Sequence, residues 1–241
     1  ASHSKRTRLA KTLAHMGQDA AVLSDSASIA WLLNIRGADI DCTPVVLAFA
    51  ILHANATLDL FLHTSKLPEP VRAWLGPDIR VHEPTQLETV LTNLHGKTVG
   101  VDPATNAVWF AETLSRHKAT VQESPDPCLL PKALKNATAQ EGARNAHLKD
   151  GIALCRFLHW LDTQGRGTTE LKAAEKLNSF RAEGQDYRGE SFPAISGAGP
   201  NGAIIHYRVT PQTDRPLNAN EVYLIDSGGQ YPEGTTDVTR T

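Results

Sequence analysis

The segment LIDSGGQYPEGTTDVTRT, residues 224–241, places two aspartates, Asp226 and Asp237, on either side of a glycine-rich turn. VYLID is typical of a buried strand and TTDVTRT of a β-rich return strand, so the segment predicts a hairpin whose turn centres near Tyr231 and Pro232. In that register the two carboxylates are cross-strand neighbours on one face, with Cβ atoms about 4.5–5.5 Å apart. Two like charges placed in this way repel each other, so a purely structural hairpin gains nothing from them.

Divalent cations would turn this repulsion into attraction. A bridging pair of carboxylates can hold two metal ions about 3.5–4 Å apart, and carboxylate oxygens suit Mn²⁺ and similar hard ions. The pattern therefore predicts that Asp226 and Asp237 are ligands of a dinuclear metal site. The alternative is a loose hairpin with two surface aspartates. Gly228 and Gly229 are expected to allow unusual backbone angles or a bulge between the strands.

A histidine and a glycine-rich loop precede the hairpin. His206 lies in the apolar run IIHYR, where a histidine alone is most often buried, and the neighbouring carboxylates make it a candidate site residue. GAGPNG, residues 197–202, has the spacing of a dinucleotide-binding loop, which needs a helix directly after it. AIIHY follows instead, a β-type run, so we expect no dinucleotide site. We interpret the following histidines as surface or internally satisfied side chains: His53, His63, His82, His95, His117, His147 and His159.

Composition narrows the class of protein. Of the 241 residues, 41% are hydrophobic and 21% charged, and the net charge is -2, which gives no electrostatic case for binding nucleic acid or an anionic membrane. The apolar run VVLAFAIL is far shorter than the ~20 residues of a membrane span, and the N-terminus lacks the apolar core of a signal peptide. Three scattered cysteines are expected to be reduced thiols. These features predict a cytoplasmic protein.

The first half of the chain predicts an α/β domain. Short apolar strands such as DAAVLS, VVLAFAILH and TLDLFL alternate with helical segments such as SIAWLLN and AVWFAETLSR. Pro125, Pro127 and Pro131 then fall close together, a density that neither a helix nor a central strand continues. We therefore place a domain boundary near residue 131, with the first domain at residues 1–131.

The second domain, residues 132–241, predicts helices followed by antiparallel strands, an α+β pattern. Thr138 and Glu141 have the spacing of a capping box at the start of a long helix. That helix has Ile152, Cys155, Leu158 and Trp160 among its apolar positions, and a second helix is expected over roughly residues 169–182.

The hairpin sequence, preceded by GAIIHY, resembles the aminopeptidase P (Xaa-Pro aminopeptidase) branch of the pita-bread metallopeptidases, three-domain type. WLLNIRGADI, residues 31–40, resembles the start of their middle domain, and the segment from KNATAQEG to FLHWLD resembles the helix that opens their catalytic domain. The resemblance implies a creatinase-type N-terminal-like α/β domain followed by an incomplete α+β pita-bread domain.

The resemblance also assigns roles to individual residues. Asp226 matches the first aspartate ligand and Asp237 the second, bridging one. His206 matches the histidine that contacts the scissile carbonyl region and helps with proton movement. Phe192 matches a wall of the substrate pocket, and Thr239 a residue that supports the ligands from behind. The family's remaining ligands, a histidine and two glutamates, have no counterpart up to Thr241, so the chain is expected to be a middle portion of a longer enzyme.

The activity that the resemblance implies is removal of the N-terminal residue from peptides with proline in second position. The water that attacks the peptide would be activated by two divalent metal ions, most often Mn²⁺, with Zn²⁺ or Co²⁺ as alternatives. The implied partners are such peptides and a second copy of the chain in a homodimer. Three alternatives remain open: a prolidase or creatinase-type hydrolase, a non-catalytic binding module, and a fragment that is inactive alone.

Overall fold

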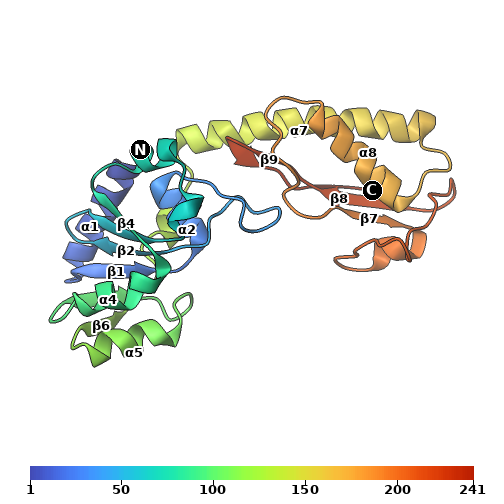
Figure 1. The fold of residues 1–241 in the computed structure, drawn as a ribbon. Coiled ribbons are helices and arrows are strands. Elements are labelled where there is room, and N and C mark those ends of the chain that lie inside the picture. Colours follow the sequence, from blue (N-terminus) through green and yellow to red (C-terminus); the bar gives the residue numbers. More distant parts are fainter. The chain divides into compact units, whose positions relative to one another are not determined.

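A computed structural model describes residues 1–241, and the chain divides into two compact units (Figure 1). Unit 1 consists of Ala1–Ile40 and Pro44–Leu134, and unit 2 of Asp41–Thr43 and Lys135–Thr241. The predicted boundary near residue 131 falls inside the short helix α6 (Leu129–Ala133) of unit 1. A proline is tolerated there because Pro131 lies in the first turn, where backbone N–H groups have no partner within the helix.

Unit 1 is built on one mixed six-stranded sheet, in the order β4-β3-β2-β1-β5-β6. Its strands are β1 (Ala20–Leu23), β2 (Phe49–His53), β3 (Leu58–Phe61), β4 (Ile79–His82), β5 (Thr98–Val101) and β6 (Thr120–Glu123). β2 is antiparallel to both neighbours, whereas β1 and β5, β5 and β6, and β3 and β4 pair in parallel. The predicted strand VVLAFAILH is correct only in its second half, since residues 45–48 precede β2.

Helices cover both faces of this sheet (Figure 1). They are α1 (Ser2–His15), α2 (Ser26–Leu33), α3 (Glu69–Leu75), α4 (Leu87–Thr92) and α5 (Val108–Arg116), with 3-10 turns at η1 (Thr64–Lys66) and η2 (Pro84–Gln86). Residues of α1, α2 and α3 belong to the hydrophobic core on one face, and residues of α4 and α5 to the core on the other. This arrangement, a sheet between two layers of helices, is that of the α/β class predicted for this region.

The strands of unit 1 alternate between the two cores. In β3, Leu58 and Leu60 belong to the core under α1 and α2, whereas Phe61 belongs to the core under α4 and α5. Successive side chains of a strand point to opposite faces, so Asp59 also lies on the α4 and α5 side. The same alternation puts Arg80 and His82 of β4 on that side, since Ile79 belongs to the other core.

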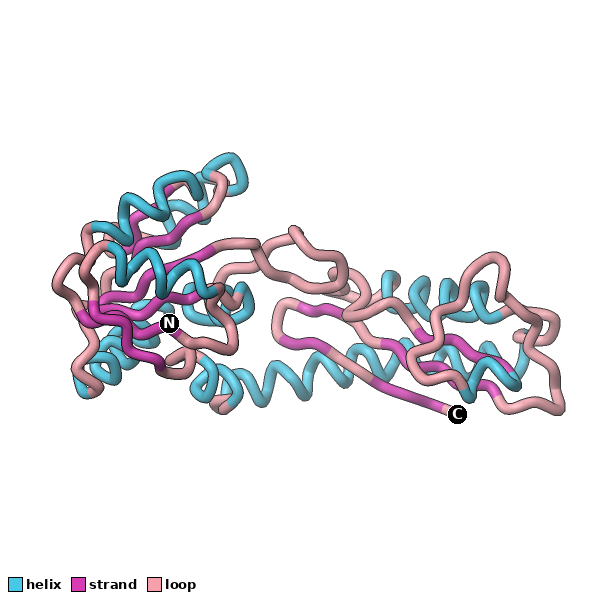
Figure 2. Tube along the Cα trace, turned by 90° about the horizontal axis from the view of Figure 1, so that it is seen from below, coloured by secondary structure: helices cyan, strands magenta, loops and turns pink.

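Unit 2 contains two long helices and two small sheets (Figures 1 and 2). The helices are α7 (Ala137–Gln164) and α8 (Glu170–Ala182). One sheet has the order β11-β8-β7, formed by β7 (Ile195–Ala198), β8 (Tyr223–Ser227) and β11 (Val238–Arg240), and the other pairs β9 (Gln230–Tyr231) with β10 (Gly234–Thr235). All pairings are antiparallel, as the sequence predicted for this region.

The structure corrects two expectations about α7. The predicted capping box of Thr138 and Glu141 is wrong, because the N-cap is Asn136, whose side-chain oxygen accepts from the backbone N–H of Ala139 at 2.8 Å. Of the predicted apolar positions, Ile152, Cys155 and Leu158 are exposed, whereas Trp160 is partly buried against the core of unit 2. The buried side is instead formed by smaller residues and one charge: Gly142, Ala146, Asp150, Ala153, Leu154 and Phe157. No helix is both long and apolar enough to cross a membrane.

Candidate metal centre

Asp226 lies in the middle of the three-stranded sheet of unit 2. It is on the central strand β8, between Ile195 of β7 and Thr239 of β11. The neighbouring residue Ile225 points to the opposite face and packs in the core formed with α7 and α8. The helices therefore cover one face of this sheet, and Asp226 projects from the other.

The hairpin has a different register from the predicted one. Asp226 faces Thr239, not Asp237, and the two-residue turn is Pro232–Glu233 because Tyr231 pairs with Gly234. Continuing this register places Asp237 opposite Gly228. The shift is two residues, which is one full side-chain period, so Asp226, Asp237 and Thr239 still project from one face. The two aspartates form a diagonal pair, for which about 7–8 Å is the usual spacing, instead of a directly opposed pair.

Position 228 has to be glycine because neighbouring atoms leave no room for a side chain, and not because of its backbone conformation. A Cβ at this position would lie 1.9 Å from the carbonyl oxygen of Thr236 and 2.2 Å from Ser191 Oγ. Neither Gly228 nor Gly229 has a positive φ, and the pairing register is the same on both sides of them, so the structure shows neither a left-handed backbone nor a bulge at these glycines. The close approach brings the loop at Ser191 against the hairpin, next to the strand position that carries Asp226.

One carboxylate oxygen of Asp226 is buried without a partner. Asp226 Oδ1 is inaccessible to solvent and accepts no hydrogen bond, although Asp226 as a residue is half-buried. An unpaired buried carboxylate oxygen carries a desolvation penalty unless a cation or donor binds it. The neighbouring Asp237 is exposed on the same face. Two hard oxygen donors, one of them orphaned, fit a divalent metal site.

The aspartates of this chain do not complete a metal site by themselves. No group of three or more histidine, cysteine, aspartate or glutamate side chains able to hold a metal ion is present. His206 therefore does not join Asp226 and Asp237 in a three-ligand cluster. The two aspartates share a face, and further ligands would have to come from outside these residues.

The remaining predicted site residues lie on loops and an edge strand. The predicted β-type run AIIHY is wrong: the 3-10 turn η3 (Gly199–Ala203) comes first, and His206 follows in a turn with φ 54°. His206 is exposed, not buried as a histidine in an apolar run would be. Phe192 is half-buried on the loop before β7, and Thr239 is exposed on β11.

A buried ionic network lies beneath the hairpin. Arg181 of α8 donates to Asp150 of α7 through Nε at 2.7 Å and through Nη2 at 3.2 Å, and both side chains are fully buried. Arg181 Nη2 also donates to Ser227 Oγ at 3.1 Å, and the Tyr231 hydroxyl donates to Asp150 at 3.2 Å. The network ties both helices to the residue after Asp226 and to the hairpin.

Sequence reasoning missed this network. The sequence did contain a signal for it. Residues four apart lie on the same side of a helix, so Asp150 shares the buried side of α7 with Ala146, and Arg181 shares that of α8 with Leu177. Burial raises the pKa of the Tyr231 hydroxyl, and the nearby Asp150 carboxylate adds to the shift, so the tyrosine stays a neutral donor.

Two family models match the chain. Residues 1–139 match the creatinase/prolidase N-terminal domain, and residues 141–241 match metallopeptidase family M24. Among curated proteins, an Xaa-Pro aminopeptidase of Drosophila melanogaster is 38% identical over 239 residues, covering 92% of this chain and 37% of that protein. Xaa-Pro aminopeptidase 1 of Dictyostelium discoideum is 36% identical over 250 residues, covering 100% of this chain and 39% of that protein.

Solved structures agree over the whole chain. An X-prolyl aminopeptidase of Caenorhabditis elegans, described as a cytosolic enzyme with a di-nuclear active site, superposes with a TM-score of 0.91 at 30% identity, covering 100% of this chain and 41% of that one. An Xaa-Pro dipeptidase of Bacillus anthracis has a TM-score of 0.77 at 15% identity, covering 100% of this chain and 64% of that one, and shows the fold alone.

The length relation matters for function, because the chain spans well under half of the curated relatives that it matches. Both predicted fold assignments, the creatinase-type N-terminal domain and the incomplete pita-bread domain, are confirmed by the family models and the structural neighbours. The chain belongs to the creatinase/prolidase and M24 metallopeptidase family, with the N-terminal domain in unit 1 and part of the M24 domain in unit 2.

Proposed function

We propose that this chain is part of a metal-dependent aminopeptidase that removes the N-terminal residue from peptides with proline in second position. The observation that carries the proposal is the orphaned oxygen of Asp226 on the open face of the sheet, beside Asp237. The relatives named Xaa-Pro aminopeptidase, which match nearly the whole chain, support this substrate class.

Asp226 and Asp237 would hold two divalent metal ions, together with ligands outside these residues. Oxygen donors favour Mn²⁺, with Zn²⁺ or Co²⁺ as alternatives. Such ions supply an activated water and polarise the substrate carbonyl when bound. The role of this chain is to hold the ligands in place. Strand β8, which carries Asp226, lies between β7 and β11, and Arg181 donates a hydrogen bond to Ser227 on the face of the strand opposite Asp226.

His206 would act on the substrate and not on the metal. Its imidazole is exposed on a turn and belongs to no three-ligand cluster, which leaves it free to hold or move a proton at the scissile carbonyl. Phe192 would form part of the pocket wall. Thr239 faces Asp226 across the strands, where its hydroxyl could orient the carboxylate.

The proposed substrate explains why a metal site is needed. The bond before proline is a tertiary amide without an N–H, and proline fixes φ, so a peptidase that binds an extended backbone by hydrogen bonds fits it poorly. By analogy with the Caenorhabditis elegans enzyme, described as cytosolic, we further propose a cytoplasmic location. A homodimer of the complete protein is part of the same proposal.

The test uses the complete protein that carries this chain, with its metal content and its turnover of an Xaa-Pro tripeptide measured together. Asp226→Ala and Asp237→Ala should each lose bound metal and lower kcat/KM by more than about 100-fold, since even changes behind metal ligands cost 10–100-fold. His206→Ala should lower kcat with metal content unchanged. Normal turnover in either aspartate variant would refute the metal assignment.

The substrate panel separates the proposed activity from its nearest alternative. A prolidase cuts only Xaa-Pro dipeptides, whereas the proposed enzyme also cuts tripeptides and longer peptides. Hydrolysis confined to dipeptides would therefore replace the aminopeptidase with a prolidase, and no hydrolysis by metal-loaded protein would favour a binding module.

A further inference from the structure

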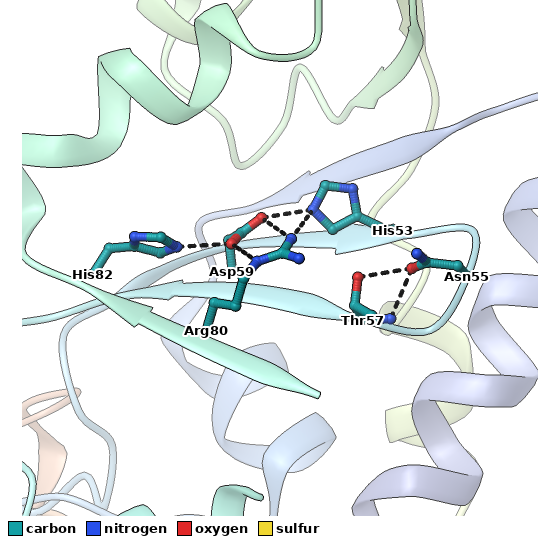
Figure 3. A network of polar contacts seen from close by, with 6 residues as sticks. All are labelled: His53, Asn55, Thr57, Asp59, Arg80 and His82. Carbon is teal, nitrogen blue, oxygen red and sulfur yellow. Dashed lines mark hydrogen bonds and ion pairs between the residues drawn. The ribbon is translucent and has the colours of Figure 1, made fainter. Parts of the chain in front are cut away.

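Unit 1 contains a polar cluster that the proposed peptidase activity does not use. The cluster consists of His53, Asp59, Arg80 and His82 (Figure 3), all on the face of the sheet that α4 and α5 cover. These residues come from the edge strand β4 and its two neighbours β3 and β2, whereas the core beneath α4 and α5 extends over β1, β5 and part of β2 and β3. The cluster therefore lies toward the β4 side of the sheet, beside that core.

Asp59 is the centre of the cluster and is fully satisfied. Its side chain is 3% exposed and accepts from Arg80 Nε at 2.7 Å and Arg80 Nη2 at 2.8 Å. The two imidazoles contact it from either side through Nε2, His53 and His82 each at 2.7 Å (Figure 3). Burial by itself would raise the pKa of Asp59, but the hydrogen bonds from Arg80, His53 and His82 outweigh burial and hold it well below its usual range.

A cavity of about 610 Å³ lies against this cluster. Its walls include the four cluster residues, the β2–β3 turn at Asn55, and residues of and after α4 such as Val90, Asn93 and Leu94, with Asp19 and Lys97 at the rim. Its volume is within the range of about 300–1,000 Å³ that small-molecule sites occupy. All of these residues belong to unit 1.

Among the charged groups of the cavity wall, the two cations Arg80 and Lys97 keep free hydrogen-bond donors. Asp59 uses its acceptor capacity on the cluster, and Asp19 accepts from the backbone of Thr98 at 2.9 Å and from Lys97 at 3.4 Å. Arg80 Nη1 and the side-chain amide of Asn93 have no hydrogen bond within the chain. The only polar side-chain contact of Lys97 is the long one to Asp19, at 3.4 Å. A ligand that satisfies such a wall must be rich in acceptors.

We propose that this cavity binds a small organic anion, with its carboxylate or phosphate group on Arg80, Asn93 and Lys97 and its apolar part against Val90 and Leu94. Asp59 holds the guanidinium through Nε and Nη2, so the remaining nitrogen, Nη1, has a fixed orientation and can donate a charge-assisted hydrogen bond to an oxyanion.

A metal ion fits the same residues poorly. Two imidazoles and a carboxylate are a common ligand set, but here Arg80 donates to both oxygens of Asp59. The positive charge of the guanidinium occupies the place where a cation would bind. No group of residues able to hold a metal ion is present at this cluster.

The test measures binding of three probes to the full chain by isothermal titration calorimetry. Phenyl phosphate and benzoate carry the two candidate anionic groups on the same apolar ring, and benzyl alcohol is the neutral control. We expect saturable binding of at least one anion and none of benzyl alcohol. Binding of phenyl phosphate alone assigns the site to phosphate esters, binding of benzoate alone assigns it to carboxylates, and binding of both supports a site that recognises the shared charge.

The key variant is Asn93→Asp, which adds a negative charge to the wall without touching the Asp59 cluster. Asn93 is exposed at the end of α4, so the fold should persist, which circular dichroism checks. We expect anion affinity to fall about tenfold or more, because the new carboxylate repels the ligand at short range. Asn145→Asp makes the same charge change at an exposed position of α7 in unit 2 and should leave affinity unchanged.

A second variant, Lys97→Gln, removes a cation from the rim and should weaken binding without altering thermal stability. The proposal is overturned if neither anion binds at millimolar concentration, if benzyl alcohol binds as well as the anions, or if Asn145→Asp weakens binding as much as Asn93→Asp. None of these measurements depends on peptidase activity, so the anion-binding proposal can fail or succeed independently of the proposed peptidase function.

Discussion

Asp59 in unit 1 and Asp226 in unit 2 are both aspartates on β-strands, yet their surroundings differ in one decisive respect. The Asp59 carboxylate accepts from an arginine and contacts two histidines, all within 2.8 Å. Asp226 has an oxygen that is equally removed from water and accepts nothing. Asp59 is neutralised by its own unit, whereas Asp226 is left without a counter-charge.

This difference separates a carboxylate that supports the fold from one that is available to bind. A buried charge is tolerated when it is paired and hydrogen-bonded, and otherwise it costs stability. Asp150, which Arg181 and Tyr231 satisfy, belongs with Asp59. By the same reasoning the unpaired oxygen of Asp226 is available to a cation, and this is the physical basis for proposing a metal ligand there.

The comparison is tested most strongly at Asp150 and Arg181, where both side chains are fully buried. Arg181→Met should lower the free energy of unfolding of unit 2 by about 3–5 kcal/mol, because it leaves Asp150 as a buried charge without its ion pair. Urea denaturation followed by the fluorescence of Trp160, a residue of α7, measures the change. The double variant Asp150→Leu with Arg181→Met should recover much of the loss, and no recovery would contradict the charge argument.

Asp59→Asn should destabilise unit 1 by about 2–3 kcal/mol, less than a fully buried pair because Arg80 is half exposed and water can solvate it again. The folded-state pKa of Asp59 lies below its unfolded value of about 3.9, so this stability is fully present above about pH 4 and is lost as pH falls further. The gap between wild type and variant in urea midpoint should therefore be full at neutral pH and should narrow below about pH 4.

The matched control for Asp59→Asn is Asp162→Asn, which changes an exposed aspartate of α7. It should leave the unfolding of unit 1 unchanged at every pH. A gap for Asp59→Asn that widened in acid would show that the carboxylate is not stabilised in its charged form.

Asp226→Asn should raise the free energy of unfolding, the opposite of the effect expected for Asp59→Asn. Removing a half-buried carboxylate whose Oδ1 is buried and unpaired should stabilise the metal-free chain by about 1 kcal/mol, even though the same change should abolish metal binding by the complete protein. Asp237→Asn, at an exposed position of the same face, should produce no measurable change in stability. Thermal unfolding in the presence of a chelator compares the variants, and destabilisation by Asp226→Asn would mean that the carboxylate is satisfied after all.

The smallest effect concerns the start of α7, the helix that carries Asp150. Asn136→Ala should cost about 1 kcal/mol because it removes the oxygen that caps the backbone N–H of Ala139. Thr138→Ala should cost much less, since Thr138 lies inside the helix and not at its cap. Equal losses for the two variants in urea denaturation would restore the capping box that the sequence suggested.

The sequence predicted the order of elements well where the signal is local. Apolar strands such as Ala20–Leu23 and Leu58–Phe61, and the helical segments SIAWLLN and AVWFAETLSR, lie close to their predicted places. It failed where a contact between distant residues decides. IIHYR appeared to be a strand because of its apolar residues, but η3 ends directly before this run and His206 lies in a turn. The hairpin register was wrong by two residues because a glycine-rich turn allows more than one pairing.

The sequence by itself determined the candidate chemistry of this protein: two aspartates around a glycine-rich hairpin, on a chain with a net charge of only -2. Residue types and short spacings are enough for that, because they are properties of neighbouring residues. Only the tertiary structure decided which carboxylates are satisfied, since the partners of Asp59 lie 6 to 23 residues away and Arg181 lies 31 residues from Asp150. Long-range packing sets burial and pairing, and these two quantities distinguish Asp226 from the aspartates that hold the fold together.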